Sequence, residues 1–209
     1  MRRNRGMWES ALVYGTRDCP FTEEFLIVDL ETSGLDPARD EILAIGAVIV
    51  RNGEILRRFH TFVQAEQPLR PWISRLTGIT EGMLQEAPDC ASGLEALLEF
   101  GDGRPMAVHC GEFTLSFLWA GCQRFGMELE PVCVDIGRVA KALFPEMKSR
   151  RLKQIARQLG LPAPERNEPL ESAGICAGVL ARLFGELEKR GIDSMQGIRA
   201  YERGIRNEG

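Results

Sequence analysis

An apolar segment that carries two carboxylates, FLIVDLETSGLD from Phe25 to Asp36, constrains the fold more than any other part of the sequence. An apolar run of this length that breaks at Gly34 is typical of a buried strand. Side chains alternate between the two faces of a strand, so Asp29 and Glu31 point to the same side. Two like charges at the end of an apolar strand are costly unless a cation neutralises them. The segment therefore indicates a strand whose end carries a metal site or the remnant of one.

The segments that follow predict a mixed sheet flanked by helices, an α/β fold. EILAIGAVIV and EILRRFHTFVQ read as two further strands, and the Asn52-Gly53 pair between them is the strongest short hairpin signal. Three consecutive antiparallel strands are therefore expected. Shorter strands are predicted at PMAVH and PVCVDI, helices at 91–100, 113–126, 137–144, 151–160 and 169–190, and a turn-rich passage at 64–80.

Length and composition fit one domain. The chain has 209 residues, 44% of them hydrophobic, which is enough for a full core. We expect a domain over 25–188, an N-terminal extension over 1–24, and a C-terminal tail over 189–209 for which a short amphipathic helix is one interpretation. No run is long enough to span a bilayer, and the basic start lacks an apolar signal core. These features predict a cytoplasmic protein with no membrane partner.

The net charge of −4 argues against a protein that coats nucleic acid by general attraction, which usually needs a strongly basic face. It does not exclude an enzyme that holds one strand end through bound cations. The six cysteines form no CxxC pair or other tight cluster, so we interpret them as reduced thiols rather than metal ligands.

Two motifs in the first half of the chain carry a family resemblance. FLIVDLETSGLD, followed at once by DEILAIGAV, resembles the first motif of the DnaQ-like 3′–5′ exonucleases of the DEDDh type. That superfamily includes the proofreading epsilon subunit of bacterial DNA polymerase III and RNase T. ISRLTGIT at Ile73 to Thr80 resembles the family's next block, and the likeness extends to about Leu183.

The resemblance implies an RNase H-like exonuclease fold and a two-metal phosphodiesterase. In the family, four carboxylates hold two Mg²⁺ or Mn²⁺ ions, and a histidine takes a proton from the attacking water. Two hard cations stabilise both the entering and the leaving oxygen of an in-line displacement, and oxygen ligands suit them. Asp29 and Glu31 match the first two of these metal-binding, catalytic carboxylates.

The resemblance also implies that the other catalytic residues are replaced. AVHCGEFTLSFL aligns with the second motif through its scaffold residues, and this puts Thr114 at the third carboxylate. NEPLESA aligns with the third motif and puts Asn167 at the general base and Ser172 at the fourth carboxylate. Loss of a general base alone typically lowers a rate about 10²–10⁴-fold. We expect at most one divalent metal site and weak or absent hydrolysis.

Several neighbouring residues leave alternatives open. Glu168 would share a face with Ser172 and compensate for the lost ligand if the helix already begins there. The segment after the first strand matches the part of the family that binds the terminal nucleotide, or it forms a simple strand-ending turn. Its residues are Thr32, Ser33, Gly34 and Leu35.

A basic cluster and a histidine also have two interpretations each. One basic cluster contacts a phosphate backbone or is simply a solvated surface, and the sequence favours neither interpretation. Its members are Lys148, Arg150, Arg151 and Lys153. His109 is interpreted as a strand-end histidine rather than a replacement base.

Three functions therefore compete. The first is a slow 3′–5′ exonuclease on single-stranded DNA or RNA ends. The second is an inactive relative that binds nucleic-acid 3′ ends. The third is an exonuclease-fold scaffold for protein–protein interaction.

Overall fold

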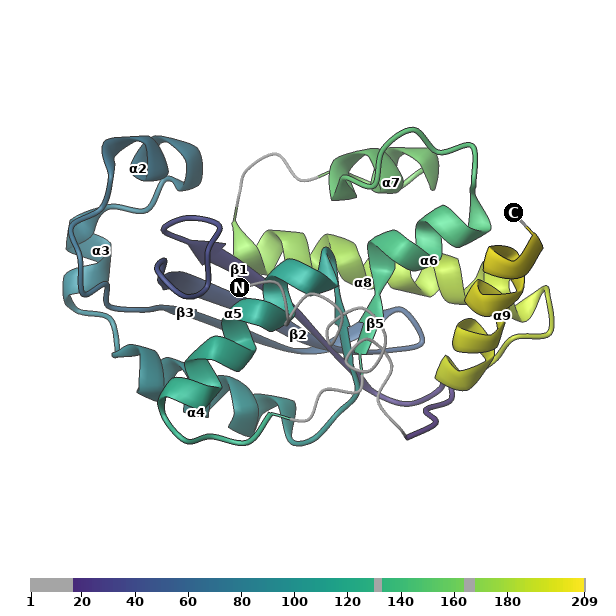
Figure 1. The fold of residues 1–209 in the computed structure, drawn as a ribbon, viewed down its shortest axis with the longest axis horizontal. Helices are drawn as coiled ribbons and strands as arrows, with labels where there is room; N and C mark the ends of the chain where they lie inside the picture. Colours follow the sequence, from purple (N-terminus) through teal and green to yellow (C-terminus); the bar gives the residue numbers. More distant parts are fainter. Residues whose placement is uncertain (1–16, 130–132, 164–167, 209) are drawn as a thin grey trace.

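The computed structural model of the chain describes residues 17–129, 133–163 and 168–208. In this part of the chain a five-stranded sheet has the order β3-β2-β1-β4-β5 (Figure 1). The strands are β1 (Phe25–Thr32), β2 (Ile42–Arg51), β3 (Glu54–Phe62), β4 (Met106–Val108) and β5 (Cys133–Asp135). β1 pairs with β2 and β2 with β3 in antiparallel fashion, whereas β4 is parallel to β1 and β5 is parallel to β4. The expected mixed sheet with three leading antiparallel strands is confirmed.

The predicted hairpin between β2 and β3 is confirmed in its turn geometry. Asn52 and Gly53 both have positive φ, 51° and 82°, and the flanking Arg51 and Glu54 pair directly across the turn. Two consecutive left-handed residues make a turn whose twist matches that of the strands, which is why Asn-Gly is favoured there.

Helices cover both faces of the sheet. Their bounds are α2 (Pro71–Thr77), α3 (Glu81–Gln85), α4 (Cys90–Gly101), α5 (Gly111–Arg124), α6 (Ile136–Leu143), α7 (Leu152–Gln158), α8 (Pro169–Glu188) and α9 (Met195–Glu208). Leu26 and Val28 of β1 pack in one core with α4 and α5, whereas Phe25 and Ile27 pack in the other with α6 to α9. Asp29, two residues after Ile27, therefore faces the layer that contains α8.

The passage expected to be turn-rich contains a helix instead, so that expectation was wrong for α2. Proline occupies the first turn of α2, and Gly78 ends the helix in the left-handed region with φ 76°, donating its N–H to the Ser74 carbonyl. Ile73 on α2 is buried together with Leu84 of α3 in a small separate cluster. A helix of two turns shows too little periodicity to detect, although its start and stop signals are both present.

The segment before β1 and the C-terminal helix lie side by side. Pro20 and Ser194 form a β-bridge, and the N–H of Met195 donates to the Cys19 carbonyl at 3.0 Å. Met195 and Ile198 are buried in the same core as β1 and α8. α9 thus packs on α6 in the helical layer, while the predicted domain boundaries remain a proposal.

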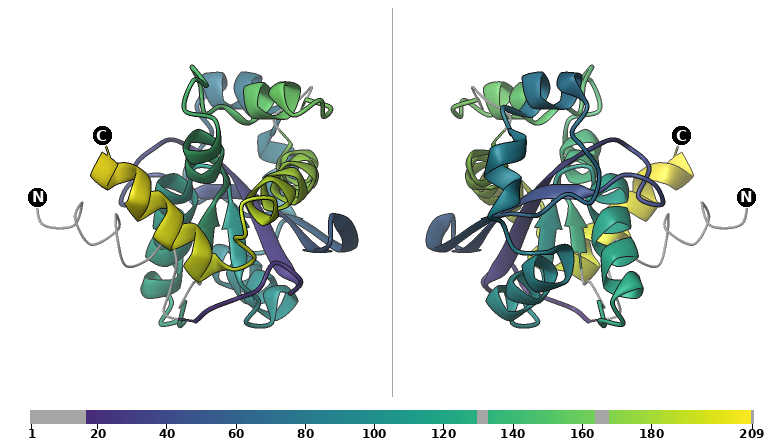
Figure 2. Two further views of the ribbon diagram at one scale, coloured as in Figure 1. Left: turned by 90° about the vertical axis from the view of Figure 1, so that its right-hand side faces the viewer. Right: turned by 90° about the vertical axis from the view of Figure 1, so that its left-hand side faces the viewer.

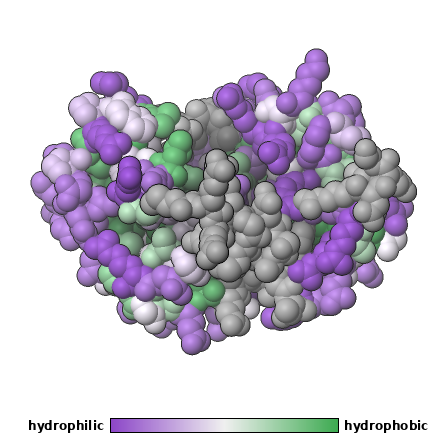
Figure 3. All heavy atoms as spheres, in the orientation of Figure 1, coloured by the Kyte–Doolittle hydropathy of each residue, from purple (hydrophilic) through white to green (hydrophobic). Residues whose placement is uncertain are grey.

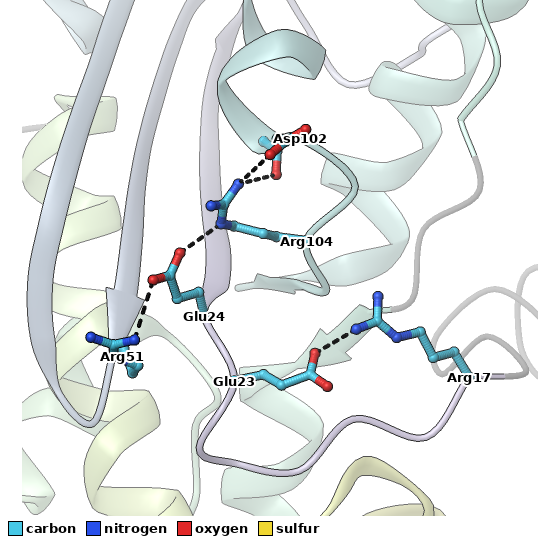
Figure 4. A network of polar contacts seen from close by, with 7 residues as sticks. Arg17, Glu23, Glu24, Arg51, Asp102 and Arg104 are labelled. Carbon is cyan, nitrogen blue, oxygen red and sulfur yellow. Dashed lines mark hydrogen bonds and ion pairs between the residues drawn. The ribbon is translucent and has the colours of Figure 1, made fainter.

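A polar network at the amino end of β1 joins three segments (Figure 4). Glu24 lies between Arg104, at 2.8 Å, and Arg51 of the hairpin, at 3.6 Å. Arg104 also pairs with Asp102 at 3.3 Å. Partly exposed pairs of this kind contribute at most about 1 kcal/mol each. They lie at the opposite end of β1 from Asp29, so they support the scaffold and not the site.

Gly46 of β2 determines how closely α8 approaches the sheet. A Cβ at this position would lie 2.3 Å from the Pro169 carbonyl carbon and the Leu170 nitrogen, both of which are backbone atoms. Gly46 pairs with Asp29 in the β1–β2 ladder. The absence of a side chain therefore lets the first turn of α8 lie beside Asp29.

We expect Gly46→Ala to lower the free energy of unfolding by about 3 kcal/mol, because backbone atoms would have to move to make room for the Cβ. Urea unfolding of the metal-free protein measures the change. Gly185→Ala is the matched control, since a Cβ there meets nothing within 4 Å and lies in a helix, where alanine is favoured by about 0.5–1 kcal/mol. Equal stability of Gly46→Ala and wild type would contradict the close approach.

Candidate active site

Asp29 and Glu31 lie near the carboxyl end of β1, on the same face and both half-buried. The Asp29 carboxylate accepts hydrogen bonds from the Ser172 hydroxyl of α8 and from the backbone N–H of Leu30. Ser172 thus lies against Asp29, and its assignment to the fourth carboxylate position stays a prediction. A neutral hydroxyl occupies that place.

Burial determines the protonation of the acid pair. Desolvation raises the pKa of Asp29 from 3.8 to about 6, against the lowering effect of its hydrogen bonds. Desolvation, followed by the charge of Asp29, raises the pKa of Glu31 from 4.5 to about 7. No Lys or Arg in the described part of the chain forms an ion pair with either acid. The negative charge of the pair is therefore not neutralised by any described basic side chain. A bound divalent cation would neutralise it.

The donor set fits one hard divalent ion better than two. Two carboxylates, completed by water and substrate phosphate oxygens, are a common way to hold Mg²⁺. Within residues 17–129, 133–163 and 168–204, no group of three or more His, Cys, Asp or Glu side chains gathers in a metal-binding arrangement. A single-ion site at Asp29 and Glu31 stays a prediction.

Thr114 is buried on α5 and directs its hydroxyl to the segment between β4 and α5. The hydroxyl donates to the His109 carbonyl at 3.4 Å. A hydroxyl supplies no charge, and the assignment of Thr114 to the third carboxylate position stays a prediction.

His109 directly follows β4, and both of its ring nitrogens form contacts. Nε2 lies 2.6 Å from the Arg150 carbonyl, which can only accept, so Nε2 carries the proton in this contact. Nδ1 then accepts from the Cys110 thiol, whose sulfur is 3.5 Å away. His109 joins β4 to the segment before α7, which supports its interpretation as a strand-end histidine.

Sequence reasoning gave Asp135 no role, although it is a buried acid at the same end of the sheet. Its carboxylate accepts from the Gly111 N–H and the Arg138 N–H, each at 2.9 Å. It therefore fixes the starts of α5 and α6 next to the ends of β4 and β5. The available signal was an aspartate directly before a helix, the usual N-cap pattern.

Two of the remaining expectations concern the region before α8. Asn167 lies outside the described residues. Glu168 is the N-cap of α8, with extended backbone and an exposed side chain. The condition under which Glu168 would share a helical face with Ser172 is not met, because the helix begins at Pro169.

The loop after β1 is closed by its own polar groups. The Thr32 hydroxyl donates to the Gly34 carbonyl at 2.6 Å, and the Ser33 hydroxyl accepts from the Glu41 N–H at 2.8 Å. A Cβ on Gly34 would lie 2.2 Å from the Asp40 carboxylate, so a larger residue there would require the Asp40 side chain to move. Leu35 is 83% exposed. The loop thus uses its hydroxyls internally and offers an apolar side chain to solvent.

The basic cluster before α7 is solvent-facing. Lys148, Arg150, Arg151 and Lys153 are all exposed, and none forms an ion pair with another described residue. The hydrogen bond between Arg150 and His109 places the cluster beside the carboxyl end of β4, the parallel neighbour of β1.

Comparison with known proteins gives one family. The RNase T family model, described as an exonuclease, matches residues 26–166. The PolC-type DNA polymerase III of Caldanaerobacter subterraneus subsp. tengcongensis is 30% identical over 187 residues. That alignment covers 90% of this chain but 13% of the polymerase, so the chain spans a small part of such relatives.

Solved structures of nucleases share the fold. The nuclease domain of 3′hExo, a DEDDh family member bound to rAMP, has a TM-score of 0.68 at 18% identity, covering 78% of this chain and 92% of that one. Exonuclease X in complex with 5′ overhanging duplex DNA has a TM-score of 0.65 at 19% identity, covering 85% of this chain and 99% of that one. Among the described helices, none is long and apolar enough to cross a membrane.

Proposed function

We propose that this chain, which belongs to the RNase T exonuclease family within the DnaQ-like 3′–5′ exonuclease superfamily, binds the 3′ end of single-stranded DNA or RNA. We further propose that it hydrolyses phosphodiester bonds weakly or not at all. The observation that carries the second part is the Ser172 hydroxyl, which donates to Asp29 where a fourth carboxylate is expected. The proposal includes a cytoplasmic location.

Asp29 and Glu31 would hold one Mg²⁺ or Mn²⁺ ion, which supplies positive charge to a bound phosphate. Ionisation of both acids is required for this, and their raised pKa values mean that metal and protons compete at the site near neutral pH. Ser172 orients the Asp29 carboxylate by its hydrogen bond. Thr114 and Ser172 contribute no charge, so the described residues lack the carboxylates that a second ion needs.

A nuclease assay tests the proposal. The protein is incubated with a single strand carrying a labelled 3′ nucleotide in Mn²⁺, beside Asp29→Asn. We expect slow or undetectable release of label, and loss of any release in Asp29→Asn, because the carboxylate holds the ion. Release that persists in Asp29→Asn would come from a contaminant. Release at a rate typical of proofreading exonucleases, abolished by Asp29→Asn, would contradict the proposed loss of hydrolysis.

Binding of the same strand across a salt series tests the other half of the proposal. We expect affinity to fall as salt rises, because each neutralised phosphate releases counterions. A complete absence of salt-sensitive binding would overturn the proposal and favour the scaffold function. The neutral residues at Thr114 and Ser172 are the observation that keeps this scaffold as the second candidate, with a protein partner in place of nucleic acid.

A further inference from the structure

The outer edge of the sheet at β3 is a surface separate from the acid pair. β3 has nine residues, stands last in the order β3-β2-β1-β4-β5, and is separated from β1 by β2. We propose that this edge binds an extended acidic segment of a partner protein, which adds to the sheet as a further strand. The inference goes beyond the proposed function, because it concerns a protein partner and a different part of the sheet.

The backbone of β3 is paired on one side. β2 pairs with β3 along its length, and among the described residues no other segment forms a backbone hydrogen bond with residues 54–62. At the opposite edge of the sheet, β5 is three residues long and α6 follows it directly. β3 therefore presents the longer row of unpaired N–H and C=O groups, which is the feature to which a strand of another chain can add.

A β-bulge limits the part of this edge that a partner can use. Between Ile49 and Val50 of β2 the pairing register skips Leu56 of β3. An extra residue of this kind interrupts the ladder and increases the local twist. The regular part of the edge is therefore 57–62, at the end of β3 away from the hairpin turn.

Basic side chains lie along this regular part. Its sequence, RRFHTF, contains two arginines and no acid. The Arg57 guanidinium lies over the ring of Phe100, 4.8 Å from its centre, and so is on the α4 side of the sheet. Arg58 points to the other side, is exposed, and forms no ion pair with another described residue. The edge thus carries a positive charge that the described part of the chain does not neutralise.

The pictures show that this edge is open. In Figure 2 the blue strand at the margin of the ribbon is β3, and no described helix lies beyond it. On the face shown in Figure 3, by contrast, hydrophobic and hydrophilic atoms of the described residues alternate in small patches. A partner recognised by one large apolar area on that face is therefore not favoured, whereas the β3 edge offers backbone groups and charge together.

Complementarity identifies the occupant. Opposite charges that face each other across two strands stabilise the pairing, and like charges weaken it. A segment that alternates acidic and apolar residues places its acids opposite Arg58 and its apolar side chains on the face of Phe59, which packs in the core with α4. A second copy of β3 fits less well, since its regular part has no acid. A nucleic acid has phosphates but no peptide backbone to extend the ladder.

The test measures the fluorescence anisotropy of a labelled short peptide of alternating glutamate and valine. One control peptide has lysine in place of glutamate, and a second has N-methylated valines. We expect only the unmodified glutamate–valine peptide to bind the wild type. Lysine reverses the charge, and N-methylation removes the N–H donors that an added strand needs.

A charge reversal on β3 tests the position of the peptide. Arg58→Glu should weaken binding of the glutamate–valine peptide at least about fivefold, because an attractive cross-strand pair becomes a repulsive one. Arg203→Glu is the matched control, since Arg203 is exposed on α9, which packs on α6, and the net charge changes equally. This control should bind the peptide like the wild type. Thermal unfolding checks that both variants are folded.

Amide hydrogen exchange locates the bound peptide. Exchange should slow in residues 57–62 and stay unchanged in β5. Wild type that does not bind the peptide overturns the inference, as does equal binding of the N-methylated peptide. Slowed exchange at α7 in place of β3 would assign the peptide to the basic cluster there and also overturn it.

Two further results would contradict the acidic partner strand. A dimer in sedimentation, with β3 amides protected in the absence of peptide, would make a second copy the occupant. Equal competition by a thymidine oligonucleotide would make the edge a general polyanion surface. Peptide binding does not depend on release of label from a 3′ end, so this inference and the proposed function fail separately.

Discussion

The triple variant Thr114→Asp/Asn167→His/Ser172→Asp is expected to release nucleotides from a 3′ end at least about a thousandfold faster than the wild type. The substitutions place two carboxylates and a general base where the family motifs have them. A general base contributes about 10²–10⁴-fold, and the charge stabilisation from a second metal ion adds to it. Release of a labelled terminal nucleotide in Mn²⁺ measures the gain.

A charge-free variant is the control for the triple variant. Thr114→Asn/Asn167→His/Ser172→Asn has side chains of the same size without the carboxylates, and it should release nucleotides much more slowly than the triple variant. Adding Asp29→Asn to the active triple variant should abolish the gain. An inactive triple variant that is folded and binds Mn²⁺ would contradict the motif register.

The stability of a Ser172 variant tests independently whether position 172 reaches the metal site. Ser172 lies against Asp29, so Ser172→Asp alone would put two carboxylates in contact. This variant should lose stability in a metal chelator, because like charges in a partly buried place repel, and should regain it in Mn²⁺. Stability that does not respond to Mn²⁺ would show that position 172 does not reach the metal.

The sheet was predictable because its signals are local. β1 and β2 are apolar runs of eight and ten residues, and Asn52-Gly53 fixes the turn that follows β2. The alternation of faces placed Asp29 and Glu31 together without any knowledge of the rest of the chain. The family motifs then supplied the positions of Thr114 and Ser172, which periodicity could not.

The contacts of the site depend on residues far apart in the sequence and could not be predicted. The bond between Ser172 and Asp29 needs the close approach of α8 at Gly46, more than a hundred positions from Ser172. The bond of Asp135 to Gly111 requires β4 and β5 to be neighbours. The exposed face of α2 escaped prediction because two turns of helix give little periodicity.

The acid pair makes the metal-free protein less stable as pH rises, and Asp29→Asn is expected to remove much of this loss. An acid whose pKa is higher in the folded state stabilises the fold only while it is protonated. For Asp29 this stability is complete below about pH 3.8 and is lost as pH rises through about 6; for Glu31 the loss extends to about 7. The amide introduced by Asp29→Asn can still accept the Ser172 hydrogen bond but carries no charge.

We therefore expect Asp29→Asn, in a metal chelator at pH 8, to exceed the wild type in unfolding free energy by about 2 kcal/mol, or roughly 4–8 °C in Tm. Near pH 4 the two proteins should be equally stable. Mn²⁺ at pH 8 should stabilise the wild type and not the variant, because the ion binds only the folded carboxylate pair.

Asp89 provides the control of opposite sign. Its carboxylate caps α4 by accepting from the Ser92 N–H at 2.8 Å, and this hydrogen bond lowers its pKa. An acid with a lowered pKa stabilises the fold above its unfolded-state pKa, and this stability is lost as pH falls. Asp89→Asn should therefore be less stable than the wild type at pH 8. If Asp29→Asn were also destabilising at pH 8 without metal, a cationic group of the protein would already neutralise the pair, and the divalent-ion site would lose its physical basis.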